Sequence, residues 1–178
     1  MKKAFTYLLA FIIPAIFVSD LFAQTNVASV NARAGVVHAI TITKTTDLNF
    51  GNLSVGSTGG TVVYDPNTLS RTASAGSSIT LPSVTGNPTL ATFTVSGESL
   101  YSFIVTLPST TLTLDDGLSH TMTVNSFTSN LSSSGSIGTL NSSGTATLTV
   151  GATLNVNANQ YVGTYNSTIP FTILVNYN

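Results

Sequence analysis

The residues of this chain that could do chemistry are few, and the two histidines come first. His38 lies within an apolar, strand-like stretch, and His120 lies beside a turn far along the sequence. Neither stands in a metal-ligand spacing such as His-Glu-x-x-His, which puts two ligands on one helix face. No Gly-x-Ser-x-Gly turn exposes a serine nucleophile. We therefore interpret both histidines as ordinary strand or turn side chains, and we expect no catalytic residue, no metal and no cofactor.

Asp115 and Asp116 are adjacent carboxylates, and two carboxylates are all that a glycosidase requires. Adjacent residues of a strand point to opposite faces, so the pair would not converge from within a strand. Gly117 follows them, and Asp-Asp-Gly is typical of a tight turn between two strands. We interpret the pair as a turn rather than as a catalytic or calcium site, and we predict that the protein is not an enzyme.

The first 23 residues have the pattern of a secretory signal peptide. The basic pair Lys2-Lys3 precedes an apolar stretch from Ala4 to Val18, and Ala23 stands before the expected cleavage point. The stretch is shorter than the ~18 to 20 residues that a membrane span needs, and Pro14 interrupts it. Cleavage after Ala23 would leave 155 of the 178 residues, with no transmembrane segment. We expect an exported protein of the periplasm, the cell surface or the extracellular space.

The predicted mature chain carries very little charge. Its net charge is −2, from Arg33, Lys44 and Arg71 against Asp47, Asp65, Glu98, Asp115 and Asp116. Such a surface has no electrostatic attraction for nucleic acid or for anionic lipid. Its 22 serines and 29 threonines make up about a third of those 155 residues, and threonine favours strands. Because the chain has no cysteine, packing and backbone pairing alone must hold the fold.

Alternation of apolar and polar residues dominates the rest of the chain, and no helical periodicity follows the signal peptide. Short alternating segments separated by Gly, Pro, Asn and Asp turns are typical of an antiparallel sandwich or barrel. The segment Ser129 to Gly144 is rich in Ser and Gly and is predicted to be a long loop or hairpin tip. We expect one all-β domain over residues 35–178, with strands near 37–42, 48–50, 61–64, 79–81, 91–95, 101–107, 112–114, 122–124, 146–150 and 169–177.

Both ends of the predicted mature chain alternate. Residues 24–34 form an extended N-terminal arm whose alternate positions are apolar, namely Ala28, Val30, Ala32 and Ala34. The final segment places five apolar residues on one face, namely Ile169, Phe171, Ile173, Val175 and Tyr177. An extended arm ahead of a β-domain can pair with the sheet edge of a neighbouring subunit. The alternatives are a flexible leader or first strand for the arm, and a core strand of a closed sandwich for the final segment.

Six blocks of sequence, in order along the mature chain, carry a family resemblance. They are LNFGNL at 48–53, GTVVYDP at 60–66, ATFTVSG at 91–97, MTV at 122–124, GATLNV at 151–156, and the close from GTY at 163–165 to NYN at 176–178. Together they make the chain resemble the bacterial secreted family named domain of unknown function 4402. The resemblance implies an immunoglobulin-like antiparallel β-sandwich related to spore-coat-U-like and pilin-like domains. Pilins end in an alternating strand with a penultimate aromatic, as Tyr177 is here, but this chain lacks the pilin cysteine pair and its arm is mostly alanine.

Two functions follow as expectations. The first is a structural, pilin-like or coat-like subunit, in which residues Ala28–Ala34 of a neighbour add a strand beside Ile169–Tyr177. Its expected partners are further copies of itself or a periplasmic chaperone. The second is a monomeric binding module for a glycan or another surface ligand. Such a module needs exposed aromatic side chains in a groove, and the candidates are Tyr64, Tyr101, Tyr161 and Tyr165.

Overall fold

The computed structural model describes residues 26–83, 86–131 and 136–178 of the chain. The chain divides into two units, one ending at Gly35 and the other comprising Val36–Asn178. In the first unit, the described residues 26–35 belong to no strand or helix, and every one of them is exposed. The predicted signal peptide and its cleavage point lie outside the described residues.

The secondary-structure elements of the described residues are all β-strands, which confirms the all-β prediction. The strands are β1 Thr41–Thr46, β2 Ser54–Val55, β3 Gly60–Asp65, β4 Ser70–Ala73, β5 Ile79–Thr80, β6 Ala91–Ser96, β7 Ser102–Thr106, β8 Leu112–Asp115, β9 Thr121–Ser129, β10 Ile137–Thr139, β11 Thr145–Val156, β12 Asn166–Ser167 and β13 Leu174–Tyr177. The pairings between them are antiparallel. A helix with the length and apolarity to cross a membrane is absent from the described ranges.

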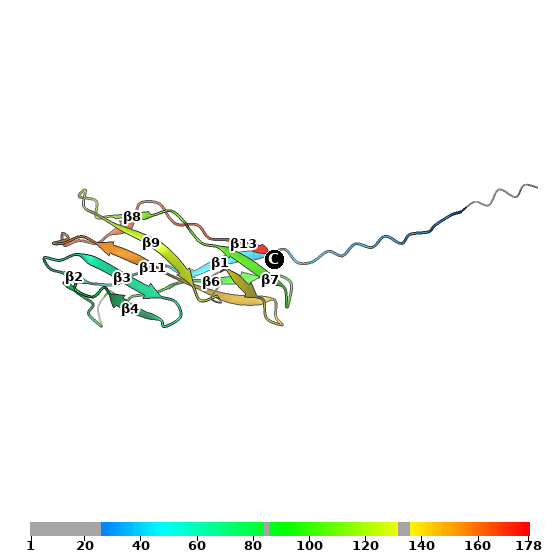
Figure 1. Cartoon of the computed structure of the whole chain (residues 1–178), viewed down its shortest axis with the longest axis horizontal. Helices are drawn as coiled ribbons and strands as arrows, with labels where there is room; N and C mark the ends of the chain where they lie inside the picture. The colour runs from blue at the N-terminus through cyan, green and yellow to red at the C-terminus, as the bar shows by residue number, and fades with distance from the viewer. Residues whose placement is uncertain (1–25, 84–85, 132–135) are drawn as a thin grey trace, which may run out of the picture. The chain divides into compact units, whose positions relative to one another are not determined.

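A large and a small sheet make up the domain, with one further short pair of strands (Figure 1). The large sheet has the order β1-β6-β11-β9-β8-β12, with β3 and β4 joined to it through β11; the small sheet is β10-β7-β13, and β2 pairs with β5. The long strand β11 organises the large sheet. On one edge it pairs first with β6 and then with β3, and on its other edge it pairs with β9. The result is the antiparallel, sandwich-like fold that the alternation predicts.

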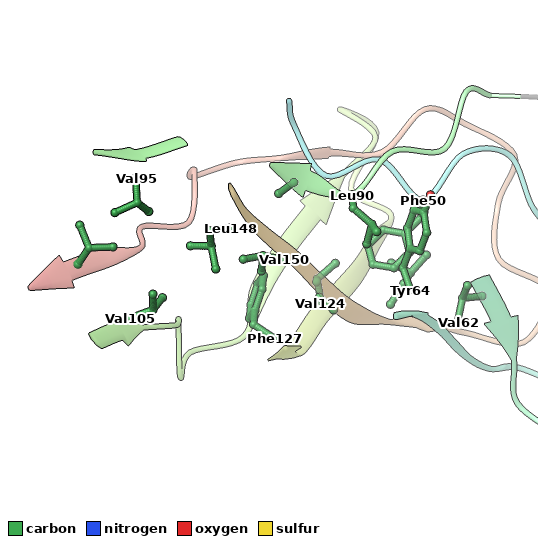
Figure 2. Close-up of a cluster of buried hydrophobic side chains, with 14 of the residues drawn as sticks. Phe50, Val62, Tyr64, Leu90, Val95, Val105, Val124, Phe127, Leu148 and Val150 are labelled. Carbon is green, nitrogen blue, oxygen red and sulfur yellow. The ribbon is translucent and has the colours of Figure 1, made fainter. Parts of the chain in front are cut away.

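Alternation places one face of each strand in a common core. Val62, Val95, Leu148 and Val150 have no exposed surface, and Phe103 is likewise completely buried. Figure 2 shows Leu148 and Val150 among the clustered apolar side chains of this core. Burying a side chain of this size stabilises the fold by about 1.5–3 kcal/mol. With no disulfide in the chain, this packing and the strand pairing hold the domain together.

The opposite face of the large sheet is covered by hydroxyl groups. Thr43, Thr94 and Thr147 are register partners on the adjacent strands β1, β6 and β11, and all three are exposed. Threonine suits this position because its branched Cβ favours a strand while its hydroxyl stays in water. The high threonine content is therefore explained by the face of the sheet that lies in solvent.

Strand boundaries differ from the prediction in several places. The first strand is Thr41–Thr46 rather than 37–42, and the predicted strand 48–50 is reduced to a single bridge at Asn49. The last strand begins at Leu174 rather than Ile169, because Pro170 has no N–H to donate to a ladder. The segment Ser129–Gly144, predicted as a loop, contains the three-residue strand β10, which pairs with β7. The short strands β2, β4 and β12 were not predicted, because two to four residues carry little periodicity.

Candidate functional site

The N-terminal arm, residues 26–35, presents apolar side chains to solvent. Val27 is 90% exposed and Val30 is 89% exposed. No hydrogen bond of residues 26–35 to another described residue is found. Alternate residues of an extended chain point to opposite sides, so Ala28, Val30, Ala32 and Ala34 share one side. The arm is thus an exposed segment whose backbone groups have no partner in the described part of the chain.

The C-terminal segment keeps its predicted alternation from residue 171 onward. Phe171, Ile173, Val175 and Tyr177 are buried or half-buried, and the residues between them are exposed. Ile169 is 69% exposed and does not share their environment. Within this segment, β13 pairs along β7, with Val175 opposite Val105. Four of the five predicted residues therefore face the domain interior, as a core strand does.

The hydroxyl of Tyr177 ties the end of the chain to the start of the domain. It accepts a hydrogen bond from the backbone N–H of Glu98 at 2.6 Å and donates one to the carbonyl oxygen of His38 at 2.7 Å. Gly97 leaves room for this hydroxyl, since a Cβ at that position would collide with it. The Glu98 carboxylate accepts hydrogen bonds from the backbone N–H of His38 at 3.0 Å and pairs with its Nδ1 at 2.8 Å. Those two bonds hold the pKa of Glu98 below its ordinary value.

A cleft opens where two paired segments of the chain separate. Thr106 is paired with Leu174 at one end, and Leu114 is paired with Ser167 at the other. Between these points no backbone hydrogen bond joins residues 107–112 to residues 169–173 of the described chain. The cleft has a volume of about 470 Å³ and is lined by residues 107–113 and 168–172.

Proline on both sides of this cleft explains why the two segments do not pair. Pro108 and Pro170 both line it, and each removes one N–H donor from a potential ladder. The lining residue Phe171 is half-buried, and its ring packs on buried Phe127 with centroids 5.0 Å apart. Ile169 stands exposed in the same lining. The cleft therefore combines unpaired backbone with apolar side chains that reach the core.

The turn between β8 and β9 holds a group of polar and aromatic side chains that contact one another. The Asp116 side chain is only 2% exposed, and its Oδ1 accepts the backbone N–H groups of Leu118 at 2.8 Å and His120 at 3.1 Å. Its Oδ2 lies 2.7 Å from Nδ1 of His120. Burial raises the pKa of Asp116, but the hydrogen bonds from His120 and Leu118 outweigh it and hold that pKa below its ordinary value. The buried carboxylate thus fixes the orientation of the imidazole.

The imidazole of His120 stacks on an exposed tyrosine. The rings of His120 and Tyr161 have centroids 3.9 Å apart and an interplanar angle of 17°. The hydroxyl of Tyr165 donates to the carbonyl oxygen of Tyr161 at 2.8 Å and accepts from Nε2 of Gln160 at 2.8 Å. These contacts join the β8–β9 turn to the segment that follows β11.

The four tyrosines that the sequence analysis proposed for a ligand groove lie in different environments. Tyr161 and Tyr165 lie together, as described above. Tyr64 is buried in the core, with its ring centroid 6.4 Å from that of Phe50. Tyr101 packs edge-on against Tyr177, with centroids 5.7 Å apart. Only the first two tyrosines share a site.

Sequence reasoning did not find the carboxylate partner of either histidine. Asp116 and His120 are four positions apart across a turn, so their spacing was a signal that could have been used. Glu98 is 60 positions from His38, and only the tertiary fold brings them together. Among the residues that the structure describes, no group of three or more metal-ligating side chains forms.

These features define an all-β, antiparallel, sandwich-like domain that carries an exposed N-terminal arm. Residues 40–177 match the model of the family described as Domain of unknown function (DUF4402). The chain therefore belongs to that family, as the sequence blocks predicted. No match was found among the curated proteins or among the solved structures.

Proposed function

We propose that this chain is an exported, non-enzymatic structural subunit of a bacterial surface assembly, built by addition of a strand from one copy to the next. The observation that carries the proposal is the exposed arm, with its apolar side chains and a backbone that has no partner among the described residues. An extended segment of this kind gains main-chain hydrogen bonds and buries alternate side chains when it joins a sheet edge.

The cleft between residues 107–113 and 168–172 is the acceptor that we propose for the arm of a second copy. Six extended residues span about 20 Å, which suits a cleft lined by seven residues on one side and five on the other. The acceptor lining carries no charged side chain, and the apolar side of the arm carries none either. Burial of Val30 alone would contribute about 1.5 kcal/mol, and the backbone pairing would add to it.

A gel comparison tests assembly. The protein processed in its native host is run unheated beside a boiled sample. Strand-exchanged polymers give a ladder that collapses only on boiling, and N-terminal sequencing should give Gln24 as the first residue. Removing residues 24–34 should abolish the ladder while the domain keeps its thermal unfolding transition. A ladder that survives the truncation would refute strand addition by the arm.

Point substitutions on the two sides of the arm provide a sharper test. Val30→Asp places a charge on the apolar side and should reduce assembly by at least tenfold. Ser29→Asp adds the same charge to the opposite side of the same arm and should leave assembly within twofold of the parent chain. Equal loss in both variants would mean that the arm acts by charge or flexibility rather than by side-chain docking.

The acceptor is tested separately with exposed residues of the domain. Ile169→Asp alters the cleft lining and should block assembly, whereas Leu69→Asp, at an equally exposed position outside that lining, should not. A periplasmic chaperone that shields the cleft would bind the parent domain and lose affinity for the Ile169→Asp variant. Assembly that tolerates Ile169→Asp but still needs the arm would refute this acceptor alone.

The second candidate, a monomeric binding module, draws support from the group of side chains around His120 and Tyr161. A single monomer band in both the unheated and the boiled lane would favour it over the structural subunit.

A further inference from the structure

A shallow depression of about 240 Å³ lies beside the β8–β9 turn, lined by residues 120, 121 and 157–161. It shares no lining residue with the cleft proposed for the arm. Figure 1 shows that this turn, where the chain passes from β8 to β9, lies at the end of the domain away from the C-terminus. A ligand bound here would therefore contact none of the residues that line the cleft.

The walls of the depression are held in fixed positions. Buried Asp116 orients His120 through Nδ1, and the His120 ring stacks on Tyr161. The carbonyl oxygen of Thr121 accepts from Nε2 of Gln160 at 3.3 Å and from Nδ2 of Asn157 at 3.4 Å. Such prior ordering lowers the entropy cost that a ligand must overcome.

One buried polar atom of this site lacks a partner. Oε1 of Gln160 is inaccessible to solvent and accepts no hydrogen bond from the described residues. Buried acceptors are almost always satisfied, because an unpaired buried acceptor destabilises the fold. Nε2 of the same amide is already committed to Thr121 and to the hydroxyl of Tyr165, so the amide is held in place. Because solvent does not reach Oε1, a sugar hydroxyl would satisfy this acceptor only if binding turned the Gln160 side chain toward the depression.

We infer that this depression binds a neutral saccharide. Its lining contains no Lys, Arg, Asp or Glu, and the carboxylate beside it, that of Asp116, is committed to His120. An ionic ligand would therefore find no free counter-charge. The remaining polar lining consists of amides and a hydroxyl, namely Asn157, Asn159, Gln160 and Thr121. Such groups pair with sugar hydroxyls in both directions.

Tyr161 provides the apolar surface that the C–H face of a sugar ring requires. Its side chain is 66% exposed although its ring is stacked on one side by His120. Aromatic walls with a few placed polar groups are the usual composition of small-molecule sites. The volume of the depression is small for a drug-sized molecule and suits one or two sugar rings.

The test uses the mature full-length protein on a printed array of neutral oligosaccharides with galactose, N-acetylglucosamine, mannose and glucose termini. The best array sugar is then titrated in solution and followed by NMR. Tyr161→Ser should weaken binding by about tenfold or more, since loss of a central tyrosine is typically that costly. Tyr161→Phe keeps the ring and should stay within threefold of the parent protein.

Two further variants separate recognition from folding. Gln160→Met removes the amide from the lining at nearly the same shape and should also weaken sugar binding; because it also breaks the two hydrogen bonds of Nε2, its thermal stability is measured in parallel. Tyr101→Ser removes a tyrosine near Tyr177 and should leave sugar binding unchanged. No binding to any neutral sugar of the array overturns the inference, and so does binding that Tyr161→Ser leaves intact. Neither result bears on assembly, which depends on the arm and the cleft.

Discussion

Replacing Tyr177 by phenylalanine removes one oxygen atom and two hydrogen bonds from the last strand. The Tyr177 hydroxyl accepts one bond from the N–H of Glu98 at 2.6 Å and donates the other to the carbonyl oxygen of His38 at 2.7 Å. A typical hydrogen bond contributes about 0.5–1.5 kcal/mol to stability. Because His38 is an exposed residue, we expect water to replace the donor that its carbonyl oxygen loses. We therefore expect Tyr177→Phe to lower the free energy of unfolding by about 1–2 kcal/mol.

The assay for Tyr177→Phe is urea unfolding of the mature protein, followed by near-ultraviolet circular dichroism. For a domain of this size the expected loss corresponds to a fall in Tm of about 3–6 °C. The dependence of unfolding free energy on urea should stay unchanged, because the surface exposed on unfolding is the same.

Tyr101→Phe is the matched control for this experiment. Tyr101 packs against Tyr177, but its hydroxyl has no hydrogen-bond partner among the described residues. Its loss should change stability by less than about 0.5 kcal/mol. If Tyr177→Phe is as stable as the parent protein, or if both variants are equally destabilised, the bridging role of this hydroxyl is wrong.

Three other predictions concern the domain itself. Gly151→Ala should destabilise it by about 1–3 kcal/mol in urea unfolding, because a Cβ there would collide with the carbonyl oxygen of Tyr64. Gly35→Ala, where nothing lies near the added atom, should be neutral, and similar losses in both would refute this packing. Leu148→Ala should cost about 2–5 kcal/mol in the same assay, because the side chain is completely buried; a loss under about 1 kcal/mol would contradict the core assignment. The folded protein holds the pKa of Asp116 below its ordinary value of 3.8. The ionised carboxylate therefore stabilises the fold fully above that pH, and this stabilisation is lost on acidification through the lower, folded-state pKa. Asp116→Asn should flatten this acid part of a stability–pH profile, and an unchanged profile would show that the buried carboxylate is not coupled to folding.

Local sequence signals predicted the parts of the site that lie within a few residues of one another. The Asp-Asp-Gly turn forms between β8 and β9 as expected, because turn geometry depends on adjacent residues. Alternation likewise predicted which residues of the segment 171–177 face inward. The cleft could not be predicted in this way, since Pro108 and Pro170 are far apart in sequence and line one cleft only through the pairing of β7 with β13.

The sequence by itself determined the class of this protein. Period-two alternation, abundant threonine and the absence of helical periodicity were enough for an antiparallel all-β domain, because each strand needs only one apolar face. The six sequence blocks also indicated the family, in agreement with the family-model match over residues 40–177. Only the tertiary structure decided that Tyr177 joins His38 to Glu98, and that Gln160 and Tyr161 meet His120. Strand order and register set those contacts, and they depend on pairing between distant segments, which local periodicity does not encode.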